Sequence, residues 1–441
     1  MTNPALIRSI EKYPACTLIC VGDVMIDHFV YGDVGRISPE APIPVVLIDR
    51  EESMLGGAGN VVRNLTSLGA KVIFLTVTGD DPAADSVAAL LRTLPNCEPR
   101  IVRDPSRRTS VKTRYLAHNQ QLLRVDSETV NPLEEKQLKK LLANFESAVP
   151  RADIAILSDY GKGVLSGNHA RCFIAAGRAA GKPVYVDPKG HDCGRYSGAS
   201  LIKPNLKELA ETTKMPVSTG LEIEAAARLW VRETDHAVIL VTRGAGGMML
   251  VRDNAQAISF LSRAREVYDV SGAGDTVAAV VALGTAAGLQ LEDAVEVACV
   301  AAGLVVAKVG TATLTQRELL HELERSEMLP ADGKILGREE AVHRVQLWKK
   351  IGFRIGFASG CFHSLSASQV AALRQARNGC EKLVVGLKAS EGTPAEHDRA
   401  ILLAAMACVD LVVMFDGADA GDLIAGLNPD TVTKVLIDEA E

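Results

Sequence analysis

Short apolar runs alternate with longer amphipathic segments along most of the chain. The runs are rich in β-branched residues and end near Gly, Asp, Asn or Pro; they are CTLICVGD (16–23), KVIFLTVTGD (71–80), ADIAILSDY (152–160), KPVYVDP (182–188), SLIKPN (200–205) and AVILVTRG (237–244). Helical patterns lie between them, at 81–94, 133–148, 167–180 and 221–233. This alternation predicts an α/β fold, a parallel sheet covered by helices on both faces. Ligands of such folds bind beyond the carboxyl ends of the strands.

Two segments depart from this pattern, at residues 43–52 and 108–126. Both have the alternation of antiparallel strands with one polar face. We therefore expect a small β-sheet that stands over the ligand site as a lid.

The C-terminal part of the chain begins a second series of strands and helices. Residues 321–345 are highly charged and contain Pro330 and Gly333, which predicts a linker or connecting helix. Apolar runs then return in FRIGFASGCF, KLVVGL and DLVVMFD. We predict a first domain over residues 1–320, a linker over 321–345 and a smaller α/β domain over 346–441.

Composition and charge exclude several classes of protein. The 441 residues are 47% hydrophobic, enough for two folded domains, and 48 Lys and Arg against 54 Asp and Glu give a net charge of −6. No basic excess points to a nucleic acid. The N-terminus lacks the apolar core of a secretory signal, and the most apolar stretch, 277–289, is too short to span a bilayer. Nine scattered cysteines show no zinc spacing, so we expect reduced thiols in a cytoplasmic protein.

The segment DVSGAGDT (269–276), followed by an apolar helical run, carries the strongest chemical signal. Glycines ahead of a helix let the backbone N–H groups of Gly272, Ala273 and Gly274 point at one anion, which the helix dipole also favours. Asp275 is then placed to deprotonate a hydroxyl nucleophile in phosphoryl transfer. By itself, the segment also fits an ordinary glycine-rich helix start.

A second motif, Gly56-Gly57-Ala58-Gly59-Asn60, precedes another helical run. Alone, it fits a tight strand-to-helix turn equally well. Together and in this order, the two segments resemble the two signatures of the ribokinase-type (phosphofructokinase-B) carbohydrate kinases. The resemblance implies a three-layer fold with a small β lid. It also implies that Gly56, Gly57 and Asn60 contact the sugar.

Further residues match the family in order, and the resemblance implies their roles. Asp27 falls where a carboxylate binds sugar hydroxyls. Asn205 and Glu208 match an N-x-x-E element whose Glu organises Mg²⁺ around ATP, although an Asn-capped helix start fits the same residues. ATP-binding roles are implied for Thr242, Gly244, Gly247 and Gly310, and a K⁺ site near Asp269 and Ser271. No Walker motif occurs, so a P-loop fold is excluded.

Longer stretches resemble the heptose 7-phosphate kinases within this family, among them residues 22–46, 114–126, 157–164 and 185–190. That resemblance implies transfer of the ATP γ-phosphoryl group to the anomeric hydroxyl of D-glycero-β-D-manno-heptose 7-phosphate, a step toward the ADP-heptose of lipopolysaccharide. A phosphorylated sugar needs cations in its pocket. The lid segment offers cations and neutral donors, namely Arg107, Arg108, Lys112, Arg114, Asn119 and Gln120, with Lys162 and Lys189 as weaker candidates. A solvated edge strand is the alternative.

The C-terminal segment resembles the nucleotidyltransferase domain of bifunctional heptose enzymes, but its motif is altered. The family turn reads G-C-F-D-x-x-H-x-G-H; here residues 360–369 place His363 at the Asp position, Ser366 and Gln369 at the two His positions and Ser368 at the Gly position. Ser and Gln carry no positive charge to stabilise a departing pyrophosphate. The chain also ends at Glu441, without a later family motif. We therefore predict a degenerate, truncated domain without adenylyltransferase activity.

Two other functions remain open at this point. One is a ribokinase-type kinase of another sugar or sugar phosphate, which would carry the same two kinase signatures. A non-catalytic sugar-phosphate sensor shares the fold, but it would have no need of Asp275. We further expect a homodimer formed through the lid.

Overall fold

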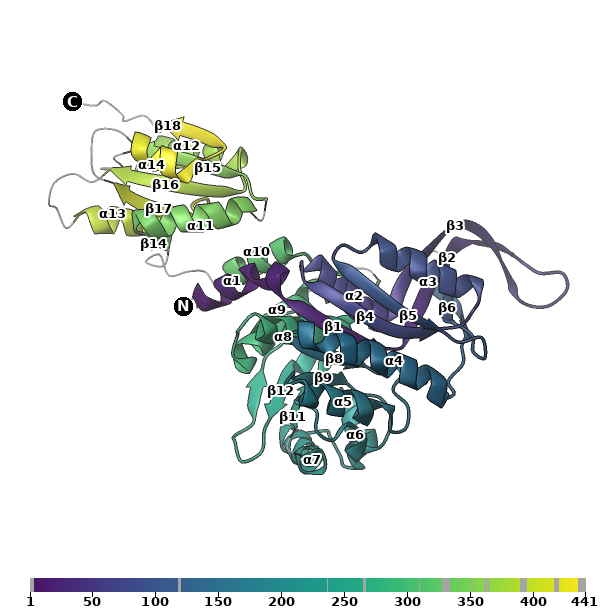
Figure 1. The fold of residues 1–441 in the computed structure, drawn as a ribbon. Helices are drawn as coiled ribbons and strands as arrows, with labels where there is room; N and C mark the ends of the chain where they lie inside the picture. The colour runs from purple at the N-terminus through teal and green to yellow at the C-terminus, as the bar shows by residue number, and fades with distance from the viewer. Residues whose placement is uncertain are drawn as a thin grey trace, which may run out of the picture. The chain divides into compact units, whose positions relative to one another are not determined.

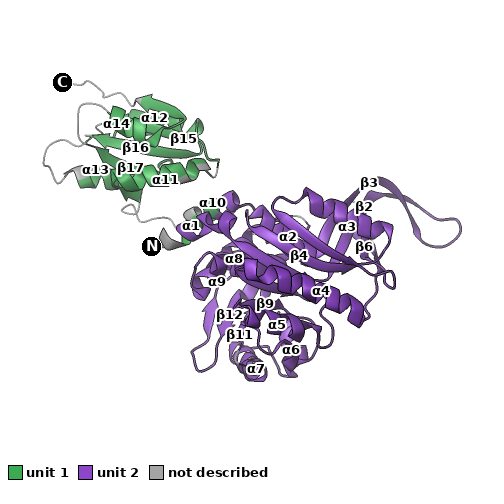
Figure 2. Ribbon diagram, viewed as in Figure 1, with its two compact units in different colours: residues 1–7, 320–441 green, residues 8–319 purple. Residues whose placement is uncertain are grey.

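The computed structural model describes residues 4–117, 120–235, 237–264, 267–308, 310–326, 334–350, 352–360, 362, 365–388, 395–415 and 420–434. Contacts divide the chain into a larger unit, residues 8–319, and a smaller one, residues 1–7 with 320–441 (Figure 2). Each unit contains its own sheet with helices on both sides (Figure 1). The predicted α/β class is confirmed for both.

A nine-stranded sheet forms the centre of the larger unit. Strand β12 runs antiparallel to both of its neighbours, β11 and β13, and all other neighbouring pairs in the sheet are parallel. In spatial order the strands are β13 (Ile258–Phe260), β12 (Met248–Val251), β11 (Val238–Thr242), β10 (Leu201–Ile202), β9 (Val184–Asp187), β8 (Ile154–Ser158), β1 (Thr17–Gly22), β4 (Lys71–Thr78) and β5 (Cys97–Arg103). All six apolar runs identified in the sequence are strands of this sheet.

Helices cover the two faces of this sheet. On one face, α8 (Ala273–Ala286) packs between α2 (Ala58–Ser67) and α9 (Leu291–Val306). On the other lie α4 (Glu135–Ala148), α5 (His169–Ala179) and α7 (Gly220–Glu233). The remaining helical segments are α1 (Pro4–Glu11), α3 (Pro82–Thr93), α6 (Leu206–Thr213), α10 (Gln316–Ser326) and the short η1 (Tyr13–Ala15), η2 (Val149–Arg151), η3 (Cys193–Tyr196) and η4 (Gly244–Gly246).

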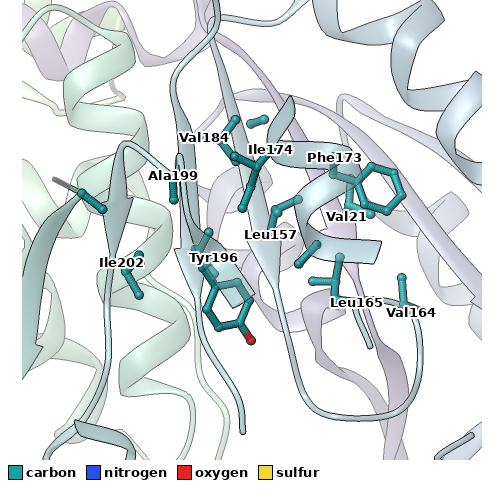
Figure 3. Close-up of a cluster of buried hydrophobic side chains, with 14 of the residues drawn as sticks. Val21, Leu157, Val164, Leu165, Phe173, Ile174, Val184, Tyr196, Ala199 and Ile202 are labelled. Carbon is teal, nitrogen blue, oxygen red and sulfur yellow. The ribbon is translucent and has the colours of Figure 1, made fainter. Parts of the chain in front are cut away.

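Strand alternation explains how both faces become buried. Val21 and Leu157 point toward α5, where they meet Phe173 and neighbouring apolar side chains (Figure 3). The Phe173 ring packs edge-on against Phe145 of α4, with centroids 5.3 Å apart. Because successive strand residues point to opposite faces, Ile156, the residue before Leu157, faces α8 instead. This double burial is why the strands read as continuous apolar runs.

The lid is a separate four-stranded sheet in the order β3 (Pro44–Gly57), β2 (Val24–Ile37), β6 (Ser110–Ala117) and β7 (Gln120–Ser127). The two predicted lid segments supply β3, β6 and β7. The sequence did not predict β2, which pairs parallel with β6. Its register against β3 shifts twice, between Tyr31 and Gly32 and between Val34 and Arg36. These irregularities interrupt the alternation by which a strand is predicted.

The smaller unit has a five-stranded parallel sheet in the order β14 (Ile335–Leu336), β17 (Leu411–Phe415), β16 (Lys382–Lys388), β15 (Ile355–Gly360) and β18 (Thr431–Lys434). One face packs on α12 (Ala367–Asn378) and α13 (Ala395–Ala404). The other packs on α11 (Arg338–Lys350) and α14 (Gly421–Leu427).

The structure differs from the predicted linker in one respect. Within residues 321–345, α10 extends to Ser326, while β14 and the first half of α11 belong to the smaller unit's fold. Ala341 and Val345 are completely buried beside Trp348. Charged residues on the exposed side of α11 conceal this narrow apolar stripe in the sequence.

The most apolar stretch of the chain, residues 277–289, forms most of α8 inside the larger unit. Val277, Val280 and Val281 of this helix are almost completely buried. Across the ranges that the structure describes, no helix is both long and apolar enough to cross a membrane.

Candidate active site

Asp275 lies at the third position of α8, where the carboxyl ends of the central strands meet the helix, and it is 5% exposed. Asn60 donates from Nδ2 to its Oδ2 at 2.7 Å, and the Tyr160 hydroxyl donates to its Oδ1 at 2.5 Å. Burial raises the pKa of Asp275, while these two hydrogen bonds and Lys203 oppose the rise. A carboxylate with a raised pKa is a stronger base than an ordinary aspartate.

The turn before α8 depends on glycine. Gly272 is the N-cap residue in the left-handed conformation, with φ of 80°. A Cβ on Gly272 would lie 2.6 Å from Nδ2 of Asn60, the atom that holds Asp275. The Ala273 N–H donates to the Val270 carbonyl at 3.3 Å, so this predicted anion donor is engaged in the turn.

The second glycine motif makes room for Asp27. A Cβ on Gly56 would lie 2.0 Å from Oδ2 of Asp27, closer than any contact permits. Gly57 starts α2 with φ of 59°, and a Cβ there would lie 2.5 Å from the Asp23 carbonyl oxygen. The motif therefore brings Asn60 to Asp275 and leaves space for a buried carboxylate beside them.

The lid contributes charges above this position. Arg114 donates to Oδ1 of the buried Asp27 at 2.5 Å. Lys112 is the register partner of Asp27 in the parallel β2–β6 pair, and its Nζ lies 3.9 Å from Asp126. The structure thus brings together the predicted sugar carboxylate and two predicted phosphate cations, and it pairs Arg114 with Asp27.

Other lid candidates lie elsewhere. Arg107 is buried and donates to the carbonyl oxygens of Thr129, Asn131 and Lys162, so it supports loops. Arg108 is exposed. Gln120 pairs with Ala117 at the far end of the lid, five residues along β6 from Lys112 and so about 16 Å away. Asn119 lies outside the described residues.

The predicted nucleotide residues surround the ends of β10 and β11. Asn205 and Glu208 form a reciprocal capping box at the start of α6, so the helix-start interpretation is confirmed, and Lys189 Nζ lies 3.1 Å from Glu208. The Thr242 N–H donates to the Pro204 carbonyl at 2.9 Å.

Gly244 has φ of 57°, and Gly247 has φ of 77°. A Cβ on Gly247 would lie 2.0 Å from the Phe260 carbonyl oxygen. Glycine is therefore needed at this hairpin, whatever its role in nucleotide binding.

Asp269 joins two predicted segments. Its carboxylate accepts the Ser271 N–H at 2.8 Å and the Gly310 N–H at 3.1 Å. The segment around Gly310 is thereby tied to the turn that leads into α8.

Sequence reasoning missed a buried ion pair between Asp187 and Lys203, whose charged atoms lie 2.9 Å apart. Burial raises the pKa of Asp187 to about 7, with Asp275 and Glu208 adding to the rise and Lys203 opposing it. A Cβ on Gly274 would lie 3.4 Å from Lys203 Nζ, so this ammonium faces the turn of α8. Their positions at the ends of strands β9 and β10 were the available signal.

Tyr160 and Asp23 were also missed. Asp23 is 2% exposed, and its carboxylate accepts the backbone N–H groups of Tyr160, Lys162 and Val164, each at 3.0 Å. The segment after β8 is therefore fixed beneath Asp275. In the described part of the chain, no group of three or more His, Cys, Asp or Glu side chains forms a metal cluster.

In the smaller unit, the turn between β15 and α12 carries the altered nucleotidyltransferase motif. The Ser366 hydroxyl accepts the Gln369 N–H at 3.3 Å, and Gln369 Oε1 accepts the Ser366 N–H at 3.2 Å. The two residues at the family's His positions thus cap their own helix. His363 lies outside the described residues.

Comparison with known proteins agrees with this architecture. The model of the pfkB family of carbohydrate kinases matches residues 17–317. The chain is similar to the bifunctional protein HldE of Paramagnetospirillum magneticum, with 44% identity over 98% of this chain and 90% of the relative. It is equally similar to that of Rhodospirillum rubrum, with 44% identity over 98% of this chain and 89% of the relative.

Solved structures share the fold. Arabidopsis thaliana ribokinase, complexed with ribose and ATP, matches with a TM-score of 0.55 and 21% identity over 70% of this chain and 98% of its own. Escherichia coli phosphofructokinase-2, in complex with potassium, matches with a TM-score of 0.59 and 20% identity over the same shares. These likenesses and the site geometry confirm the resemblance found in the sequence: the chain is a carbohydrate kinase that belongs to the pfkB family, together with the bifunctional HldE proteins.

Proposed function

We propose that this kinase transfers the γ-phosphoryl group of ATP to the anomeric hydroxyl of D-glycero-β-D-manno-heptose 7-phosphate, which yields the 1,7-bisphosphate for ADP-heptose synthesis. The observation that carries the proposal is the buried Asp275 at a glycine-started helix, below a lid that holds Asp27, Lys112 and Arg114. The sugar itself is inferred from the resemblance to heptose 7-phosphate kinases.

In this proposal Asp275 is the general base. The acceptor hydroxyl gives its proton to the carboxylate, and its oxygen forms a bond to the γ-phosphorus as the bond to the bridging oxygen of ADP breaks. The N-terminus of α8, with Gly272 and Gly274, stabilises the negative charge that develops on the transferred group. The Lys203 ammonium, which faces this turn, adds a positive charge on the same side.

The residues around Glu208 fit a magnesium ion bound with the nucleotide. Glu208 and Asp187 both act electrostatically on Lys203, so their carboxylates share one neighbourhood. Kinases hold Mg²⁺ through one or two carboxylates, waters and substrate phosphates, so a cluster of three acids is not required. We assign Glu208 to this ion through water. Bound Mg²⁺ would neutralise charge on the phosphates of ATP. A K⁺ site at Asp269 stays a prediction.

The surroundings of Lys112 are evidence for a substrate that carries a phosphate group. Burial lowers its pKa, and the neighbouring Lys162 lowers it further. A phosphate dianion beside Lys112 would oppose both effects, since an opposite charge favours the ammonium form. Lys162, whose Nζ lies 2.6 Å from Glu128, adds a second positive charge to this part of the lid.

The test is ADP release with a panel of sugars. We expect heptose 7-phosphate to give a far higher kcat/KM than unphosphorylated heptose, ribose or fructose 6-phosphate. Lys112→Ala should raise KM for the sugar phosphate about 10- to 100-fold, because one charged hydrogen bond is lost, and should leave KM for ATP nearly unchanged. The exposed Arg108→Ala is the matched control. Equal rates with unphosphorylated heptose would contradict the proposed substrate.

We also propose that the smaller unit has no adenylyltransferase activity. What supports this is the capping box, which engages Ser366 and Gln369 where imidazoles would be needed. The full chain given ATP and heptose 1-phosphate should release no pyrophosphate. Detection of ADP-heptose in that assay would contradict the proposal.

The predicted homodimer would form through the lid. Leu47, Ile48, Leu123 and Val125 are large apolar side chains of the lid with 47–72% of their surface exposed. A second copy that covers them would remove apolar surface from water. Leu123→Glu should lower the sedimentation coefficient from the value of a dimer to that of a monomer. A wild-type chain that sediments as a monomer would contradict the proposal.

A further inference from the structure

The side chain of Tyr160, a residue that the sequence analysis did not single out, contacts the carboxylate of Asp275 directly. Its hydroxyl donates to Oδ1, while Asn60 donates to Oδ2, so each carboxylate oxygen has one fixed neutral donor. The two donors belong to segments that are far apart in the sequence: Tyr160 follows β8, and Asn60 lies in the first turn of α2.

We propose that Tyr160 is a positioning residue for phosphoryl transfer: its hydroxyl fixes the orientation of the Asp275 carboxylate and stabilises the ionised form that accepts the substrate proton. This inference rests on the proposed role of Asp275 as the base.

Hydrogen bonds to buried carboxylates fix the backbone of the segment that carries Tyr160. The Asp23 carboxylate accepts three of its backbone N–H groups, from Tyr160, Lys162 and Val164. On the other side, Asp159 accepts the Gly161 N–H at 2.8 Å. Two buried carboxylates thus fix a stretch of six residues, none of which is exposed.

Asp159 is itself held by one cation and one hydroxyl. Arg195 and Tyr196 both lie 2.7 Å from its Oδ2. The Tyr196 ring packs in the apolar cluster beneath the sheet, so the far end of this chain of contacts is anchored in the core (Figure 3). The Tyr160 hydroxyl is therefore presented to Asp275 by the fold and needs no ligand to order it.

A phenol suits this position for a chemical reason. Burial, together with the carboxylates of Asp275 and Asp187, raises the pKa of Tyr160 well above its usual value, so the hydroxyl remains a donor at every working pH. A hydrogen bond from a neutral group favours the carboxylate form without the full charge that Arg114 places on Asp27. The Tyr160 hydrogen bond thus favours the ionised carboxylate of Asp275, while burial keeps the pKa of Asp275 above that of an ordinary aspartate.

Other titratable groups also face Asp275 and set its pKa. They come from β1, β2, β9 and the residue after β10, and they are Cys20, Asp27, Asp187 and Lys203. Among the described residues, Tyr160 and Asn60 are the ones whose side chains hydrogen-bond to the Asp275 carboxylate, so removal of the Tyr160 hydroxyl changes the direct environment of Oδ1 alone.

The experiment measures kcat and KM over a range of pH for wild type, Tyr160→Phe, Asp275→Asn and the double variant. We expect Tyr160→Phe to lower kcat about tenfold with KM for both substrates nearly unchanged, as for the loss of one hydrogen bond to a charged group. The acid limb of the kcat profile should move to higher pH, because a bond to the ionised form is lost. The double variant should be no slower than Asp275→Asn, since Tyr160 acts through Asp275.

Tyr115→Phe is the matched control, because Tyr115 is next to Arg114 on β6 and therefore points to the opposite face of the lid. If Tyr160→Phe fails to fold, Asp23→Asn tests the same link, and it should lower kcat and move the acid limb in the same direction.

Unchanged kcat and an unchanged acid limb in Tyr160→Phe would overturn the proposal, as would a rise in KM alone. Full turnover in Asp275→Asn would instead overturn the assignment of the base.

Discussion

Two helix starts, one in each unit, carry a family motif and are built in opposite ways. In α8 the N-cap is Gly272 and the third residue is Asp275; in α12 the N-cap is Ser366 and the third residue is Gln369. Ser366 and Gln369 satisfy each other and close their own helix. Gly272 has no side chain, so Asp275 is bound by residues of other elements instead.

The start of α2 repeats the pattern of α8. Its N-cap is Gly57 and its third residue is Asn60, the group that donates to Asp275. The two glycine-started helices therefore meet through the side chains at their third positions. At these two starts the third side chain reaches across to another helix, whereas at the start of α12 the Ser366 and Gln369 side chains bond to each other's backbone N–H groups.

Asp275→Asn tests the comparison most strongly. We expect kcat to fall about 100-fold or more, the usual loss for a general base, while substrates still bind. Gln369→Ala, at the equivalent position of α12, should leave kinase turnover unchanged. ADP release measures the turnover of both variants. Wild-type turnover in Asp275→Asn would show that the start of α8 has no catalytic role.

Gly272→Ala tests whether the turn must lack a side chain. The variant forces a Cβ at φ of 80° and 2.6 Å from Asn60, so kcat should fall about tenfold and unfolding free energy by about 1–2 kcal/mol. Gly288→Ala is the control, since Gly288 has φ of 93° with nothing within 4 Å. If both variants lose stability equally and neither loses turnover, Gly272 is required for its backbone conformation and not for the space that it leaves beside Asn60.

Gly56→Ala sharpens the argument for the second glycine motif. A Cβ at 2.0 Å from Asp27 must displace that carboxylate, so KM for the sugar phosphate should rise several-fold, with a stability loss of about 1–3 kcal/mol. Gly35→Ala, in the same lid strand pair but with open space around it, should change neither. Steady-state kinetics and urea unfolding distinguish the two.

Ser366→Ala should have the smallest effect. Loss of this cap costs about 1 kcal/mol, visible as a lower Tm of the smaller unit. Kinase kcat and KM should stay at wild-type values. A substantial loss of kinase activity with the larger unit still folded would show that the two helix starts are not functionally separate.

Much of the fold follows from local pattern. The six runs from 16–23 to 237–244 are strands because their residues are apolar on both faces, which only a doubly covered parallel sheet produces. Strand β2 was not predictable, because its register shifts mix the two faces. The predicted linker, residues 321–345, overlaps β14 and the start of α11, where charged residues conceal the apolar stripe that contains the buried Ala341 and Val345.

The site divides in the same way. The sequence by itself determined the two glycine motifs and Asp275, because a turn that requires φ above zero and open space restricts the residue to glycine. Only the tertiary structure decided that Asn60 and Tyr160 hold Asp275, that Arg114 pairs with Asp27 and that Lys203 pairs with Asp187. These partners are separated by 16 to 215 positions, and spacing along a chain carries no information about which strand ends become neighbours in a sheet.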